Sequence, residues 1–79
     1  MKIFGYTDEG RSAENAQPLE LAEVTLAATP TELRTIAKFI EAAAERIEAQ
    51  GKNYDHEHLS DSFKEFSSSP HFIIANPNV

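Results

Sequence analysis

The clearest hydrophobic pattern in the chain lies between Thr29 and Gly51, where apolar residues recur at helical spacing. These residues form one stripe along a helix, and they are Leu33, Ile36, Ala37, Ile40, Ala43, Ala44 and Ile47. Thr29 suits the N-cap, Pro30 suits the first helical position, and Glu32 completes a capping box with the threonine. Gly51 stands where a C-cap is needed. The pattern therefore predicts one long amphipathic helix.

Three short segments have the aromatic, β-branched or alternating composition of strands. They are residues 2–7 (KIFGYT), 19–28 (LELAEVTLAA) and 71–76 (HFIIAN). Residues 8–18 have loop composition, and a short helical turn fits within 60–66.

The order β, β, α, β predicts a single small α+β domain over residues 1–79. A hairpin places the first two strands side by side, and the helix crosses one face before the third strand returns beside the first. The expected result is a three-stranded antiparallel sheet of order 2-1-3, with one long helix on one face.

Apolar residues point to both faces of this expected sheet. Strand one offers Ile3 against Phe4, and strand three offers Ile73 against Phe72. Since the helix covers one face only, something else must cover the other. Either residues 52–66 fold beneath it, or another protein does so, as a second copy or as a binding target.

Composition narrows the function classes. With 79 residues the chain is near the lower size limit for a self-sufficient core, and it has no cysteine. Thirteen acidic against seven basic residues give a net charge of −6, which disfavours nucleic-acid binding and mildly favours a basic protein partner. No signal-peptide pattern and no membrane-spanning run is seen, so we expect a soluble, cytoplasmic protein without a membrane partner.

Candidate chemistry is concentrated in the run from Asp55 to Asp61, DHEHLSD. His56 and His58 would point the same way in a strand, and His71 could join them as a third zinc ligand if the segments meet. The alternative, which we adopt here, is that one histidine packs against the sheet while the other is solvated. No nucleophile motif and no phosphate loop is present, so the sequence predicts no enzyme and no cofactor.

Four stretches together resemble a family of small bacterial immunity proteins of polymorphic toxin systems, the Imm thirty-two type. They are EVTL (Glu23–Leu26), the helix opening TPTELRTIAKFI, YDHEHLSD and FIIANP, within roughly residues 19–77. The resemblance implies a bacterial cytoplasmic protein that binds and blocks a cognate toxin without being an enzyme. A homodimeric interaction module and a small metal-binding protein are the competing classes.

The resemblance supplies no binding residues, although His56, His58 and Asp61 match its characteristic stretch. From the residues themselves, the candidates for partner binding are Asp55, His56, Glu57, His58, Asp61, Phe39, Leu21 and Ile73. Phe39 lies about 90° from the centre of the helix stripe. It is either a boundary residue tucked against 52–66, the interpretation we favour, or an exposed aromatic anchor.

Overall fold

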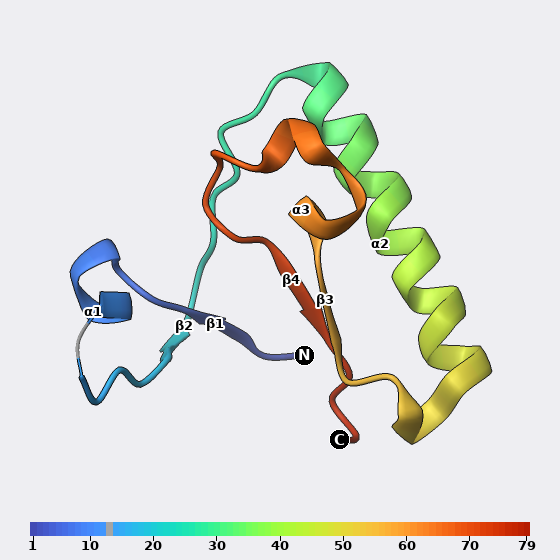
Figure 1. The fold of residues 1–79 in the computed structure, drawn as a ribbon, viewed down its shortest axis with the longest axis horizontal. Helices are drawn as coiled ribbons and strands as arrows, with labels where there is room; N and C mark the ends of the chain where they lie inside the picture. The colour runs from blue at the N-terminus through green and yellow to red at the C-terminus, as the bar shows by residue number, and fades with distance from the viewer. Residues whose placement is uncertain (13) are drawn as a thin grey trace.

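The structure, a computed structural model, describes residues 1–12 and 14–79, and one long helix dominates it (Figure 1). The helices are α1 (Asp8–Ser12), α2 (Pro30–Gln50) and α3 (Leu59–Ser62), and the strands are β1 (Ile3–Gly5), β2 (Leu19–Leu21), β3 (His56–His58) and β4 (Ile73–Ala75). Two 3-10 turns, Gly51–Asn53 and Lys64–Phe66, follow α2 and α3. The chain is therefore α+β, as the sequence predicted.

The predicted limits of α2 are confirmed, because local side chains satisfy its first backbone groups. Thr29 Oγ1 accepts the Glu32 N–H at 3.1 Å, and Glu32 Oε1 accepts the Thr29 N–H at 2.8 Å. At the other end Gly51 has a φ of 54°, and its N–H donates to the Ile47 carbonyl. A positive φ favours glycine, which explains the stop at this residue.

The capping box predicts a measurable stability effect. Thr29→Ala should lower the free energy of unfolding by about 1 kcal/mol, because the N–H of Glu32 loses its acceptor. Thr31→Ala, an exposed change in the same turn, should be neutral or slightly stabilising because alanine has the higher helix propensity. Urea unfolding of both variants checks this, and equal midpoints for Thr29→Ala and the wild type would contradict it.

The predicted three-stranded sheet is wrong. The described residues form two separate two-stranded antiparallel sheets, β1 with β2 and β3 with β4. The hairpin between the first two strands is present, with Ile3 opposite Leu21. The C-terminal strand, however, pairs with β3 and not with β1, so the order 2-1-3 does not exist.

The physical reason is that a polar segment supplies a strand. Residues 56–58 (HEH) lack the apolar alternation of a half-buried strand, and we predicted a loop there. They nevertheless pair with β4. The expected second strand, 19–28, correspondingly shortens to β2, and residues 22–29 form an extended connection to α2 (Figure 1).

Two other segments differ in detail from the prediction. The predicted loop 8–18 contains the short helix α1, while its residue 13 lies outside the described residues. The helical turn expected within 60–66 is confirmed by α3 and the 3-10 turn after it.

The core lies on a different side of α2 from the predicted stripe centre. Phe39 is 1% exposed, whereas Ile40, which belongs to the predicted stripe, is 43% exposed. Phe39 and Ile36 pack with Leu59 and Phe66, and the partly buried residues against this cluster are Phe63, Phe72 and Ile74. Residues 52–66 thus join the core on the helix side of the β3–β4 sheet.

Among the described residues, the other face of the β3–β4 sheet is partly exposed. Ile74, opposite Glu57, packs toward the core, so the neighbouring positions point the other way. His56 pairs with Ala75 and His58 with Ile73 on that face, and Ile73 is 46% exposed. We call this the open face.

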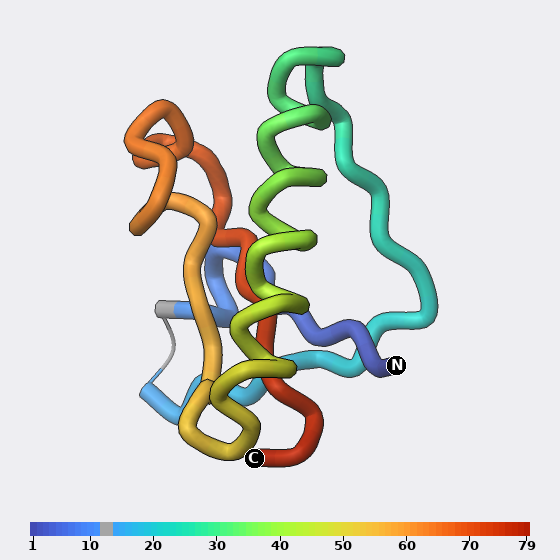
Figure 2. The backbone as a smooth tube through the Cα atoms, turned by 90° about the vertical axis from the view of Figure 1, so that its right-hand side faces the viewer, coloured from blue at the N-terminus to red at the C-terminus, as the bar shows by residue number. Residues whose placement is uncertain are grey.

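The N-terminal hairpin stands to one side of the unit formed by α2, β3 and β4 (Figure 1). Figure 2 shows α2 with α3 on one side and the 22–29 connection on the other.

Candidate functional site

An apolar groove of about 1680 Å³ lies beside α2 and β4. Its walls include residues of the N-terminal hairpin, the 22–29 connection, α2 and β4, together with His58 of β3 and His71 before β4. Apolar side chains that line it and remain about half exposed are Phe4, Val24, Leu26, Ile40 and Ile73. Exposed apolar surfaces of this extent are typical of sites that bind another molecule.

The stripe of α2 explains why the groove is apolar. Its apolar residues cover more of the helix circumference than the two-stranded sheet can bury. Ile36 and Ala43 are buried, whereas Ile40 lines the groove. The helix therefore presents apolar surface beyond the sheet.

The hydrogen bonds between β3 and β4 determine which backbone groups of β4 are used. Leu59 N–H donates to the Phe72 carbonyl at 2.9 Å. Asn76 N–H donates to the Asp55 carbonyl, also at 2.9 Å. In an antiparallel pair such bonded positions alternate with positions whose backbone groups point outward.

The alternation leaves the outer edge of β4 open. Glu57 and Ile74, which lie between these two pairs, also form a hydrogen-bonded pair. The residues on either side, Ile73 and Ala75, therefore direct their N–H and C=O groups away from β3. Within residues 1–12 and 14–79, β4 pairs with β3 alone. An extended segment could add to this edge beneath the apolar surface of α2.

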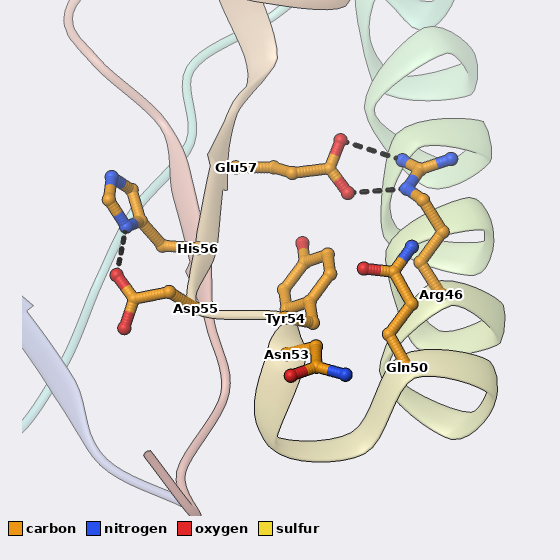
Figure 3. Close-up of a pocket in the computed structure, with 7 residues that line it drawn as sticks. All are labelled: Arg46, Gln50, Asn53, Tyr54, Asp55, His56 and Glu57. Carbon is orange, nitrogen blue, oxygen red and sulfur yellow. Dashed lines mark hydrogen bonds and ion pairs between the residues drawn. The ribbon is translucent and has the colours of Figure 1, made fainter.

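A second, polar cluster lies where α2 meets β3 (Figure 3). Arg46 of α2 donates to both carboxylate oxygens of Glu57, through Nε to Oε1 and through Nη2 to Oε2 at 2.9 Å. This bidentate pair lowers the pKa of Glu57 below its ordinary value of 4.5 and raises that of Arg46. A shallow cavity of about 230 Å³ adjoins the pair, lined by Arg46, Gln50, Asn53, Tyr54, Asp55, His56 and Glu57.

Tyr54 is the buried member of this cluster. Its side chain is 4% exposed, and its hydroxyl has no hydrogen-bond partner within the usual geometric limits among the described residues. Burial, with the nearby Glu57 carboxylate as a further cause, raises the pKa of Tyr54 to about 12. Because Glu57 is held ionised by Arg46 and Tyr54 is held neutral, the cluster suits a structural tie between α2 and β3 better than proton transfer.

The buried Asn76 closes the base of the same region. Its side-chain Nδ2 donates to the Gly51 carbonyl at 2.9 Å and to the Tyr54 carbonyl at 3.0 Å. Its Oδ1 accepts the Asn78 N–H at 3.0 Å. Neither Asn76 nor Arg46 was among the predicted binding residues, although an asparagine directly before Pro77 is a sequence signal of a turn.

The two polar residues predict opposite pH limits of stability. Glu57 has a lowered pKa in the folded protein, so its contribution is complete above about pH 4.5 and disappears as the pH falls through the folded value. Tyr54 has a raised pKa in the folded protein, so the free energy of unfolding begins to fall above pH 10.0, where the tyrosine hydroxyl ionises in the unfolded chain but not in the folded one. Between pH 10.0 and pH 12 the free energy of unfolding should fall by about 2 kcal/mol.

Unfolding free energies measured against pH test both limits. Glu57→Gln should be less stable than the wild type at pH 7, and the gap should close below about pH 4.5. Tyr54→Phe should flatten the alkaline decline, because phenylalanine has no hydroxyl that can ionise in the unfolded chain. A wild-type decline above pH 10 that persists in Tyr54→Phe would contradict the assignment.

The structure distributes the predicted binding residues over distinct places. His56, His58 and Ile73 share the open face, and Leu21 lines the groove with Ile73 and His58. Glu57 lies on the opposite face, against Arg46. Phe39 is buried, so we leave it out of the accessible surface, and Asp61 is exposed in α3.

The histidines are closer together than we expected. The Asp55 carboxylate is hydrogen-bonded to His56 Nδ1, and His58 Nδ1 lies 3.3 Å from His71 Nδ1. No described group of three or more histidine, aspartate or glutamate side chains already has the geometry to hold a metal ion. Likewise, no helix in the described residues is long and apolar enough to cross a membrane.

A small α+β chain with an uncovered apolar groove and an open strand edge has the features of a protein-binding module. Residues 23–77 match the family described as Immunity protein 32, and the chain belongs to this family. The match confirms the resemblance seen in the sequence and begins just after β2. No curated protein and no solved structure matches the chain.

Proposed function

We propose that this protein neutralises a cognate bacterial toxin by binding it in the cytoplasm, without catalysing a reaction. Membership of the Immunity protein 32 family carries the proposal. The polar cluster supports a non-enzymatic role, since its carboxylate is tied to Arg46 and is not poised to take a proton.

The proposed contact surface is the apolar groove, and its proposed occupant is an extended segment of the toxin. Such a segment would pair with the outward N–H and C=O groups of Ile73 and Ala75. Its apolar side chains would cover Ile40 of α2 and Val24 of the connection. Backbone pairing and apolar burial together account for an interaction that needs no deep pocket.

Charge favours a basic partner over a second copy of the chain. A net charge of −6 repels an identical molecule and attracts a basic one. Since this attraction acts mainly during diffusion, raising the salt concentration should slow association more than it speeds dissociation.

Co-expression with the toxin encoded beside this gene in its native genome tests the function. We expect growth to be rescued and the two purified proteins to form a complex of defined stoichiometry. Toxicity that persists at full expression of the folded protein would overturn the proposal. A homodimer that dissociates in the presence of toxin would fit a shared groove, whereas a stable dimer that ignores the toxin would favour the interaction-module alternative.

A further inference from the structure

Three imidazole rings lie next to one another on the open face. His56 and His58 are two residues apart on β3 and point to the same side of the sheet. His58 is opposite Ile73, so His71 approaches it diagonally from the segment that leads into β4. The ring centroids of His56 and His58 are 5.2 Å apart, and those of His58 and His71 are 5.4 Å apart.

The contact between His58 and His71 has the dimension of a metal site. Their Nδ1 atoms are 3.3 Å apart, a separation at which one neutral imidazole can donate an N–H to the other. Two nitrogens bound to one tetrahedral Zn²⁺ at about 2.0–2.1 Å are about 3.3–3.4 Å apart. The two rings are also nearly perpendicular, at 86°, so they are not stacked. The spacing therefore fits two ligands of one ion as well as it fits a hydrogen bond between the rings.

His56 is the candidate for a third ligand, because its ring centroid lies 5.2 Å from that of His58. Its Nδ1 is held by the Asp55 carboxylate, and Figure 3 shows the other ring nitrogen pointing away from Asp55. A carboxylate on one imidazole nitrogen is the usual way in which proteins orient the other nitrogen toward a metal. Because the three rings are not yet at coordinating distance together, His56 would join by rotation of its exposed side chain.

We infer that the open face binds a divalent transition-metal ion of the zinc class. His58 Nδ1 and His71 Nδ1 supply two ligands, and His56 Nε2 supplies the third, with Asp55 positioning His56. Imidazole ligands favour Zn²⁺, Co²⁺ and Ni²⁺ over Mg²⁺ or Ca²⁺. His58 and His71 also line the apolar groove, so the ion would lie at its border. This inference does not depend on the identity of any protein partner.

Metal titration of the untagged full chain tests the inference. Zn²⁺ binding is measured by calorimetry, and Co²⁺ binding by the visible absorption of a tetrahedral complex. We expect one ion per chain. His58→Gln and His71→Gln should each weaken Zn²⁺ binding by more than about tenfold, because losing a second-shell partner alone typically costs 10–100-fold. Asp55→Asn should cost about tenfold.

Two further measurements separate a metal site from a structural histidine pair. Nitrogen-15 spectra of the imidazoles should show Zn²⁺ shifting the Nδ1 resonances of His58 and His71 but the Nε2 resonance of His56. Metal-free His58→Gln and His71→Gln should melt like the wild type, since the core cluster contains no histidine. Zn²⁺ binding that is equal in the wild type and the His58→Gln/His71→Gln double variant would overturn the inference. His56→Gln without loss of affinity would overturn the three-ligand form.

Discussion

Replacing Phe39 with alanine should leave the protein largely unfolded at room temperature. Phe39 is the most buried large side chain among the described residues, and it packs edge-to-face on Phe72 with ring centroids 6.3 Å apart. Such a truncation costs about 3–5 kcal/mol, partly for lost burial and partly for the cavity left behind. A small chain with few buried residues has a total stability of similar size.

Chemical denaturation of Phe39→Ala and Ile40→Ala compares neighbouring positions on one helix. Ile40 is 43% exposed, so its truncation should cost about 1 kcal/mol and leave a cooperative unfolding transition. If Ile40→Ala proves more damaging than Phe39→Ala, α2 packs through the stripe centre predicted from the sequence. Near-equal losses would likewise contradict the burial described here.

Replacing Ala75 with proline should weaken toxin binding by about tenfold to a hundredfold while preserving the fold. The Ala75 N–H points away from β3, so proline removes no hydrogen bond from the β3–β4 ladder. It does remove a donor that an added strand would use. A buried carbonyl on the partner left without its donor costs about 1–3 kcal/mol, which gives the expected loss of affinity.

Surface plasmon resonance with the purified toxin measures this effect, and Ala75→Val is the matched control. Valine keeps the N–H and favours a strand, so its affinity should stay near that of the wild type. Ile73→Lys tests the side chains of the same surface and should mainly accelerate dissociation, by about thirtyfold or more. Wild-type affinity in a folded Ala75→Pro variant would exclude strand addition at β4.

The same variants distinguish a toxin from a second copy as the occupant of the groove. Sedimentation of the wild type alone should show a monomer at micromolar concentration because of the charge of −6. A wild-type dimer that Ala75→Pro converts to monomer would assign the groove to self-association instead.

Features set by adjacent residues were predictable from the sequence. The capping box needs only Thr29 and Glu32 three residues apart, and the C-cap needs only the positive φ of Gly51. The first hairpin and the turn after residue 58 also follow from local composition. The family assignment was also possible, because stretches of sequence can be compared without knowing how the chain folds.

Partner strands were not predictable from the same information. Residues 56–58 form a strand because their backbone meets β4, although HEH carries no apolar alternation. The side chains are satisfied individually, Glu57 by Arg46 and His56 by Asp55. The Arg46–Glu57 pair forms only once α2 and β3 have come together, and the Asp55–His56 contact depends on the side-chain rotamers of two adjacent residues. The hydrophobic period of the sequence reveals neither interaction.

The burial of α2 shows most directly what the sequence determined and what it left to the tertiary structure. Helical spacing established the helix and its ends, because periodicity and capping are properties of one segment. It did not establish which apolar residues face the core, since Phe39 and Ile40 are both hydrophobic and lie on neighbouring sides. That choice depended on where Leu59, Phe66 and Phe72 arrive from distant parts of the chain. Burial is a property of the packed surfaces together, and so the open groove beside Ile40 became visible only in the folded molecule.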